Sequence, residues 1–304
     1  MCAISGGTET GTPRLLSERW RGAKRQAATS HLSARLLQHA GRYPARRSTE
    51  VNHWSQAIAS ASVSESRNTL RAVVLDVDGT LYRQWPVRLR MMAGLLRHLA
   101  ANPREGGKVL RVLRAYRLAQ ERLRLCGETG MASRQIEMAA ELTGYQLAWV
   151  RSTVKTWMEE RPLEYVRRAR QPGVLEFCDW ANQRGIALAA LSDYDPRAKL
   201  AVLSLDRRVP VAACAQDPDI NVFKPHPAGM SKVLDRIGVS RKNAIYVGDR
   251  PEVDGALAIA AGVQGYILGT SKHVPAGLTA VRDWSTLQAE LTSQINWKLP
   301  CLLP

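Results

Sequence analysis

Two aspartates, Asp76 and Asp78, end an apolar run that reads Val73-Val74-Leu75. Burying an unpaired carboxylate is costly, so charged side chains at the end of a buried strand need a compensating partner. Residues i and i+2 of an extended chain point to the same side, and Gly79 lets the backbone turn sharply. The two carboxylates can therefore converge where the strand ends, in a position suited to holding a cation.

A second acidic cluster repeats this arrangement. Asp249 follows the apolar residues 244–247 and Gly248, and Asp254 lies in the next turn of chain. Two unit charges about 4 Å apart repel by roughly 4 kcal/mol at an effective dielectric near 20. If both clusters lie at one edge of a parallel sheet, they need a cation, and a site of few carboxylates favours Mg²⁺ over Ca²⁺. One DxD sequence could equally cap a turn or a helix, but that explanation does not fit two matched clusters.

A hydroxyl and an ammonium group are expected at the same edge. Ser192 ends the apolar residues 186–191, and Lys224 lies in the proline-stiffened stretch Phe223-Lys224-Pro225-His226-Pro227. Placed opposite a metal ion, the two groups would bind a phosphoryl group and offset its charge. Each also has an ordinary interpretation, Ser192 as a cap and Lys224 as a surface lysine.

The elements that must position these residues alternate between strands and helices. The apolar runs predict strands at residues 71–75, 186–191, 209–214, 244–247 and, as the last, 263–268. Helices are expected between them at residues 173–184, 196–205, 227–237 and 252–261. This alternation predicts an α/β fold with a parallel sheet covered by helices on both faces.

Residues 82–171 interrupt this alternation after the first strand. Apolar residues recur there at helical spacing, as in Leu147, Val150 and Val154. The segment is too long for a loop, so we expect a small helical bundle with its own core. Its place in the chain puts it at the carboxyl ends of the strands, where open α/β sheets bind ligands.

Charge is distributed unevenly along the 304 residues, whose net charge is +16. Residues 1–68 hold 10 Lys and Arg against 4 Asp and Glu, residues 82–172 hold 18 against 8, and the remainder is balanced at 15 against 15. Anionic partners or a solvated arginine surface would both account for the two basic segments. Five scattered cysteines without a CxxC pair argue against a disulfide framework or a zinc site.

The N-terminal tail, residues 1–68, shows no sustained periodic pattern and is expected to be disordered. It lacks the uninterrupted apolar stretch of a secretory signal, and its Arg- and Ser-rich composition is also compatible with an organelle transit peptide. No run of about 18 apolar residues occurs, so we expect no membrane span. The prediction is a cytoplasmic protein.

The motif Asp76-Val77-Asp78-Gly79-Thr80, then Ser192, Lys224 and Gly248-Asp249 with Asp254, resembles the four motifs of the haloacid dehalogenase (HAD) superfamily of phosphohydrolases. The helical insertion resembles that family's α-helical cap. The resemblance covers residues 71 to about 284. It implies a Rossmann-like, HAD-like core of residues 69–81 and 172–290, a cap of residues 82–171 and tails of residues 1–68 and 291–304.

The resemblance also implies a mechanism and assigns the site residues. Asp76 would attack phosphorus and form an aspartyl phosphate. Asp78 would act as general acid and then as general base, for which its neighbours must raise its pKa. Ser192 and Lys224 would hold the phosphoryl group. The carboxylates of Asp76 and Asp249 and the backbone carbonyl of Asp78 would bind Mg²⁺, assisted by Asp254.

The expected function is therefore a magnesium-dependent phosphatase acting on a small phosphate monoester. The dehalogenase members of the family lack the second aspartate, so Asp78 favours phosphoryl transfer, but a phosphosugar mutase stays open. Arg83, at the entry to the insertion, is a candidate ligand for an anionic substrate or an ordinary solvated arginine. A nucleic-acid-binding protein on a HAD scaffold is a further alternative, which we do not expect because no stacking aromatics interleave with the arginines.

Overall fold

The structure is a computed structural model, which describes residues 70–126, 131–269 and 274–294. The predicted N-terminal tail and most of the predicted C-terminal tail lie outside the described residues. The helix that closes the described chain reaches Gln294 and so extends past residue 290, where we expected the core to end.

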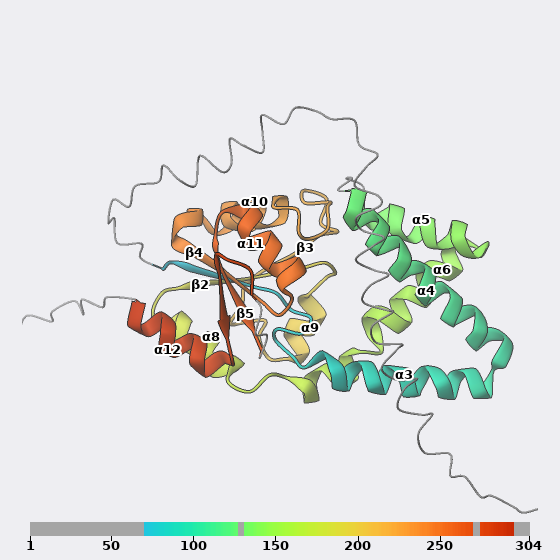
Figure 1. Cartoon of the computed structure of the whole chain (residues 1–304). Helices are drawn as coiled ribbons and strands as arrows, with labels where there is room; N and C mark the ends of the chain where they lie inside the picture. The colour runs from blue at the N-terminus through green and yellow to red at the C-terminus, as the bar shows by residue number, and fades with distance from the viewer. Residues whose placement is uncertain (1–69, 127–130, 270–273, 295–304) are drawn as a thin grey trace, which may run out of the picture. The chain divides into compact units, whose positions relative to one another are not determined.

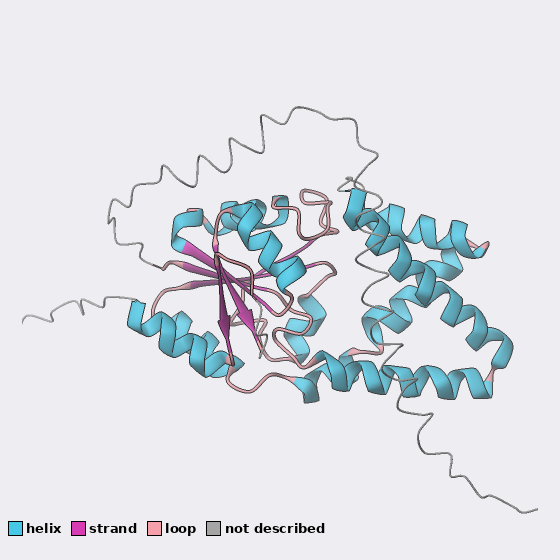
Figure 2. Cartoon of the chain, in the orientation of Figure 1, coloured by secondary structure: helices cyan, strands magenta, loops and turns pink. Residues whose placement is uncertain are grey.

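Six parallel strands form one sheet in the order β3-β2-β1-β4-β5-β6. Figures 1 and 2 show the sheet between helices. The strands are β1 (Ala72–Leu75), β2 (Ala187–Ser192), β3 (Val211–Cys214), β4 (Ala244–Gly248), β5 (Gln264–Leu268) and β6 (Leu278–Val281). This arrangement confirms the predicted parallel α/β fold. The expectation that residues 263–268 form the last strand is wrong, because the short strand β6 extends the sheet beyond β5.

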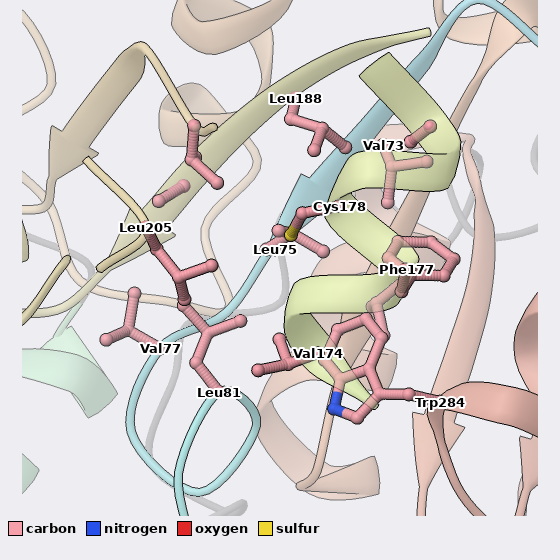
Figure 3. Packing of buried hydrophobic residues seen from close by; sticks show 14 of the residues in the cluster. Val73, Leu75, Val77, Leu81, Val174, Phe177, Cys178, Leu188, Leu205 and Trp284 are labelled. Atoms are coloured by element: carbon pink, nitrogen blue, oxygen red, sulfur yellow. The ribbon is translucent and has the colours of Figure 1, made fainter. Parts of the chain in front are cut away.

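Helices cover both faces of the sheet, and the alternation of side chains along the strands separates the two layers. Val73 and Leu75 pack into a core with α8 (Val174–Gln183) and α12 (Trp284–Gln294), part of which Figure 3 shows. Ala72 and Val74, on the opposite face, pack with α10 (Ala228–Ile237) and α11 (Ala256–Ala261). Both faces of β1 are therefore dry, as its uniformly apolar sequence predicts.

The insertion is helical, as predicted, and has its own apolar core. Its helices are α3 (Gln84–Ala101), α4 (Pro103–Cys126), α5 (Met131–Thr143), α6 (Leu147–Val154) and α7 (Leu163–Val166). A π-helical turn, Lys155–Glu160, continues α6. Val112, Tyr116, Ala139 and Val150 are buried together between these helices. None of the helices in the described part of the chain is long and apolar enough to cross a lipid bilayer.

The chain enters and leaves the insertion through two adjacent segments. The backbone N–H of Arg83 donates to the carbonyl of Ala169 over 2.8 Å, and that of Gln171 donates to the carbonyl of Leu81 over 3.0 Å. Tyr82 forms isolated β-bridges with both Asp78 and Arg170. Sheet and insertion are thus joined by a short hydrogen-bonded pair of chain segments rather than by two separate linkers.

The ring of Phe177, on α8, packs against that of Trp284, on α12. It is fully buried, and its centroid lies 4.9 Å from that of Trp284. We expect Phe177→Ala to lower the free energy of unfolding by about 3 to 5 kcal/mol, because it removes apolar contacts and leaves a cavity. Urea unfolding followed by circular dichroism measures the loss. Leu89→Ala on α3, where the side chain is 57% exposed, is the control, with an expected change within about 0.5 kcal/mol. Equal losses in both variants would contradict this account of the core.

Candidate active site

The register of the sheet brings distant motifs to one edge. Leu75 of β1 is paired with Ala190 of β2 on one side and with Val247 of β4 on the other. The N–H of Asp76 donates to the carbonyl of Val247 over 2.8 Å. Asp76 therefore comes level with the end of β4, where Asp249 follows, while Ser192 ends the neighbouring β2.

Three of the predicted carboxylates form a cluster that could hold a metal ion. One oxygen from each of Asp76, Asp249 and Asp254 lies within 4.8 Å of the other two. Asp76 and Asp254 are buried, at 4% and 1% exposure, and Asp254 sits on a π-helical turn, Pro251–Gly255. The predicted meeting of Asp76 with Asp249 and Asp254 is thus present in the structure, whereas the carboxylate of Asp78 is not part of this cluster.

Lys224 lies inside this cluster and ties two of its carboxylates together. Its Nζ donates to Asp76 Oδ1 over 2.5 Å, to Asp254 Oδ1 over 2.8 Å and to the hydroxyl of Tyr246 over 3.1 Å. With one ammonium among three carboxylates, the fully ionised cluster would carry two uncompensated negative charges. A divalent cation is the smallest ligand that offsets both.

Burial and mutual repulsion make ionisation of the cluster difficult. Burial raises the pKa of Asp76 to about 8, with the carboxylates of Asp254 and Asp249 adding to the effect of burial and Lys224 opposing it. Burial and the charge of Asp254 raise the pKa of Asp249 to about 6. Burial lowers the pKa of Lys224, but Asp254 and Asp76 outweigh it and hold that pKa well above its ordinary value. The lysine is therefore the fixed positive charge of the site.

Asp249 supplies the atom that fits a cation best. Its Oδ1 is buried and has no hydrogen-bond partner among the described residues, which is costly for an ionised oxygen unless a cation contacts it. Gly79, with a φ of 109°, leaves the space that Asp249 occupies: a Cβ there would lie 2.1 Å from Asp249 Oδ2. The donor set consists of hard oxygens, so the residues present fit Mg²⁺.

Asp78 faces a partner that the sequence did not suggest. Lys199, on α9 (Arg197–Val202), donates to both its carboxylate oxygens over 2.6 and 2.7 Å, and the hydroxyl of Tyr82 donates to Oδ1. Burial raises the pKa of Asp78, but Lys199 and Tyr82 outweigh it and hold that pKa below its ordinary value. We expected the neighbours of Asp78 to raise its pKa. The direction is reversed because Lys199 is only 8% exposed and lies directly against the carboxylate.

The remaining predicted residues are placed as follows. Ser192 is buried at the carboxyl end of β2, and its Oγ accepts a 3.4 Å hydrogen bond from the N–H of Tyr194. Arg83 is exposed and precedes the first residue of α3. Thr80, quoted in the first motif without a role, donates to Asp76 Oδ2 over 2.8 Å.

Lys199 and Tyr246 are two site residues that the sequence analysis did not predict. Lys199 sits in a short helix whose sequence, RAKLAV, reads as an ordinary surface helix, and no spacing links it to Asp78. Tyr246 did carry a usable signal. A tyrosine within the buried strand sequence AIYVG needs a partner for its hydroxyl, and here that hydroxyl contacts Lys224 and Asp254.

A family model for haloacid dehalogenase-like hydrolases matches residues 70–262, more than half of the chain. Comparison with curated protein sequences gave no match. The solved structures that resemble this chain are 14 to 21% identical to it, so they show a shared fold and no more.

Three solved structures illustrate that fold. A 2-haloacid dehalogenase from Pseudomonas syringae pv. Tomato DC3000 has a TM-score of 0.55 at 21% identity, over 74% of this chain and 99% of that one. The L-2-haloacid dehalogenase RSc1362 has a TM-score of 0.51 at 16% identity, with the same coverage. YfnB from Bacillus subtilis, assigned as a HAD-hydrolase and bound to magnesium, has a TM-score of 0.51 at 14% identity, again over 74% and 99%.

Gly79→Ala tests the close approach of the first motif to Asp249. We expect a loss of about 1 to 3 kcal/mol in the free energy of unfolding, because an alanine is strained at this φ and its Cβ displaces the Asp249 carboxylate. Gly107→Ala on α4 is the matched control. No atom lies within 4 Å of its added Cβ, so the helix should gain about 0.5 to 1 kcal/mol. Urea unfolding of both variants decides the matter, and a Gly79→Ala protein as stable as wild type would contradict the described packing.

Lys199→Met tests the contact with Asp78 through its pH dependence. Because the pKa of Asp78 is lowered in the folded state, this contact stabilises the protein above pH 4, and the stabilisation is lost as pH falls through the lowered pKa. The free energy of unfolding of the wild type should exceed that of the variant by about 1.5 to 3 kcal/mol at pH 7, and this difference should shrink toward pH 3. Lys155→Met, whose ion pair with Glu160 is exposed, should show a small difference throughout. Urea unfolding from pH 7 to pH 3 measures both; a pH-independent difference for Lys199→Met would contradict the assignment.

Proposed function

Since the chain belongs to the haloacid dehalogenase-like hydrolases, we propose that it is a magnesium-dependent phosphatase that hydrolyses a small phosphate monoester through an aspartyl-phosphate intermediate. One observation carries the proposal. The Asp76 carboxylate is buried at the end of β1 between a fixed ammonium group, on Lys224, and two further carboxylates suited to a divalent cation. Such a site holds one carboxylate oxygen beside a fixed positive charge, and a bound divalent cation would add to that charge.

The proposed reaction has two steps. An oxygen of Asp76 attacks phosphorus while the ester P–O bond breaks, and the leaving alcohol takes a proton from Asp78. Water then attacks the phosphorus of the aspartyl phosphate, loses a proton to Asp78, and releases inorganic phosphate as Asp76 is regenerated. Thr80 and Lys224 orient the Asp76 carboxylate, each through one of its oxygens.

In its contact with Lys199, Asp78 is suited to the second step, in which it accepts a proton from water. The ammonium of Lys199 keeps it ionised, which is the form that accepts a proton from water. Donation of a proton in the first step requires Asp78 to leave this contact. The side chain of Asp78 is 23% exposed, against 6% for that of Asp76, so Asp78 is the more accessible of the two.

Magnesium would be held by Asp76, Asp249 and the backbone carbonyl of Asp78, with Asp254 assisting. When bound, the ion supplies electrostatic stabilisation of the charge that develops on the transferring phosphoryl group. Lys224 and the hydroxyl of Ser192 would hold the remaining phosphoryl oxygens. Arg83, exposed at the entry to α3, stays a candidate contact for a second anionic group of the substrate.

A phosphosugar mutase of the same family is the enzyme alternative, since transfer to a sugar hydroxyl instead of water needs the same residues. Similarity in fold to haloacid dehalogenases does not favour dehalogenation here, because displacing halide from carbon requires no proton donor such as Asp78. Cytoplasmic location and a small, anionic, phosphorylated substrate complete the proposal. Nucleic-acid binding by the basic insertion is the alternative of a different class.

A screen of small phosphate esters for released inorganic phosphate tests the function. We expect at least one ester to be hydrolysed in the presence of Mg²⁺ and activity to disappear with EDTA. Asp76→Asn should lower the rate by several orders of magnitude, as loss of a nucleophile does in other enzymes. Asp219→Asn, which alters an exposed ion pair with Arg236, is the matched control and should keep full activity.

The same screen should include 2-haloacids, with free halide as readout, and bisphosphorylated sugars, with isomerised product as readout. Halide release without phosphate release would overturn the phosphatase proposal. Isomerisation faster than hydrolysis would favour the mutase. An Asp76→Asn protein as active as wild type would reject Asp76 as the nucleophile in either reaction.

A further inference from the structure

One face of α4 contacts the loops that carry the catalytic motifs. Tyr116, Gln120, Leu123 and Arg124 follow one another at helical spacing i, i+4, i+7 and i+8 and so share this face. Each has a partner on the sheet side of the molecule, in the loop after β2 or in residues 215–224. Helix α4 belongs to the insertion, so these contacts join the insertion to the active site.

Arg124 makes the strongest of these contacts. Its Nη2 donates to Asp193 Oδ2 over 2.6 Å, and its Nε donates to the backbone carbonyl of Lys224 over 3.0 Å. The side chains of Arg124 and Asp193 are 8% and 12% exposed, so water screens the pair little. A planar guanidinium that binds a carboxylate and a carbonyl at once fixes both in orientation as well as in distance.

Asp193 transmits this contact to the catalytic lysine. Its other oxygen, Oδ1, accepts a 3.1 Å hydrogen bond from the backbone N–H of Lys224. The backbone of Lys224 is therefore held at its carbonyl by Arg124 and at its N–H by Asp193. Asp193 also directly follows Ser192, so the same pair fixes the end of β2.

Apolar contacts support the arrangement on either side of the ion pair. Leu123 is buried in a small cluster with Ala215 and Phe223, the residue before Lys224. The ring of Tyr116 stacks on that of Tyr194 with centroids 6.0 Å apart. Leu123 and Tyr116 of α4 thus make apolar contacts on either side of the ion pair between Arg124 and Asp193.

We infer that Arg124 is a positioning residue for the reaction: through Asp193 and the Lys224 carbonyl it holds the Lys224 ammonium against Asp76 and Asp254. The role in catalysis rests on the proposed function, whereas the structural coupling does not. Since Arg124 comes from the insertion, the geometry of the catalytic lysine is complete only while α4 is docked against the loops. Without Arg124, Asp193 would keep a buried charge without its guanidinium partner, which displaces the loop.

The test compares Arg124→Met, Arg124→Lys and Asp193→Asn with Arg134→Met, an arginine that pairs with Glu141 on the exposed side of α5. Full-length proteins are first checked by circular dichroism and thermal unfolding. Hydrogen–deuterium exchange read by mass spectrometry then follows peptides that contain residues 192–194 and 223–226. Steady-state phosphate release gives kcat and KM for each variant.

We expect the peptides around Ser192 and Lys224 to exchange several-fold faster in Arg124→Met, to be partly restored in Arg124→Lys and to be unchanged in Arg134→Met. The kcat of Arg124→Met should fall by up to about 100-fold, with a smaller change in KM, because the lysine is misplaced. In the Arg124→Met, Asp193→Asn double variant, kcat should fall by less than the two single variants' losses combined. If Arg124→Met does not fold, Arg124→Lys and Asp193→Asn carry the same comparison.

Exchange and kcat in Arg124→Met that match Arg134→Met would overturn the inference while leaving the phosphatase proposal intact. A wild-type protein that hydrolyses no phosphate ester would instead reject the proposed function, and the exchange comparison would still decide whether Arg124 holds the Lys224 loop. Faster exchange with an unchanged kcat would reject the positioning role.

Discussion

The ammonium group of Lys224, buried between Asp76 and Asp254, is the contact on which the rest of the site depends. Without it, three carboxylates at the end of a dry sheet would repel one another, and burial would favour their protonated forms. With it, the cluster keeps a net negative charge that suits a divalent cation. The same contact holds the carboxylate of Asp76 in one position. The fold supplies what this contact requires: a parallel register that makes β1 and β4 end together, and a loop that brings Lys224 to the same edge.

The parts of the structure that follow from local pattern were predictable. A buried parallel strand must be apolar along its whole length, and Val73-Val74-Leu75 shows this directly. The meeting of Asp76 with Asp249 followed from the rule that parallel strands present their carboxyl ends at one edge. Strand β6 was not predictable in this way, because its sequence Leu278-Thr279-Ala280-Val281 is not uniformly apolar and only Val281 is buried.

The electrostatic partners were harder to foresee than the carboxylates. Lys199 and Arg124 lie on helices whose charged residues mostly face water, and nothing in their local sequence separates them from neighbours such as Arg197 or Arg122. Their roles depend on tertiary contacts with Asp78 and Asp193. The pKa of Asp78 illustrates the consequence: its burial could be inferred, but the sign of the shift is set by Lys199, which lies 121 residues away in the sequence.

The adjacent entry and exit of the insertion have an evolutionary consequence. Leu81 and Gln171 are hydrogen-bonded to each other, so the two ends of the insertion lie as close together as the ends of a short turn. Such a junction tolerates replacement of the enclosed module by a longer, shorter or differently shaped one without disturbing β1 or its pairing. Selection can therefore change the surroundings of Asp76 by exchanging one peripheral segment, while the strands that position its carboxylate stay constant.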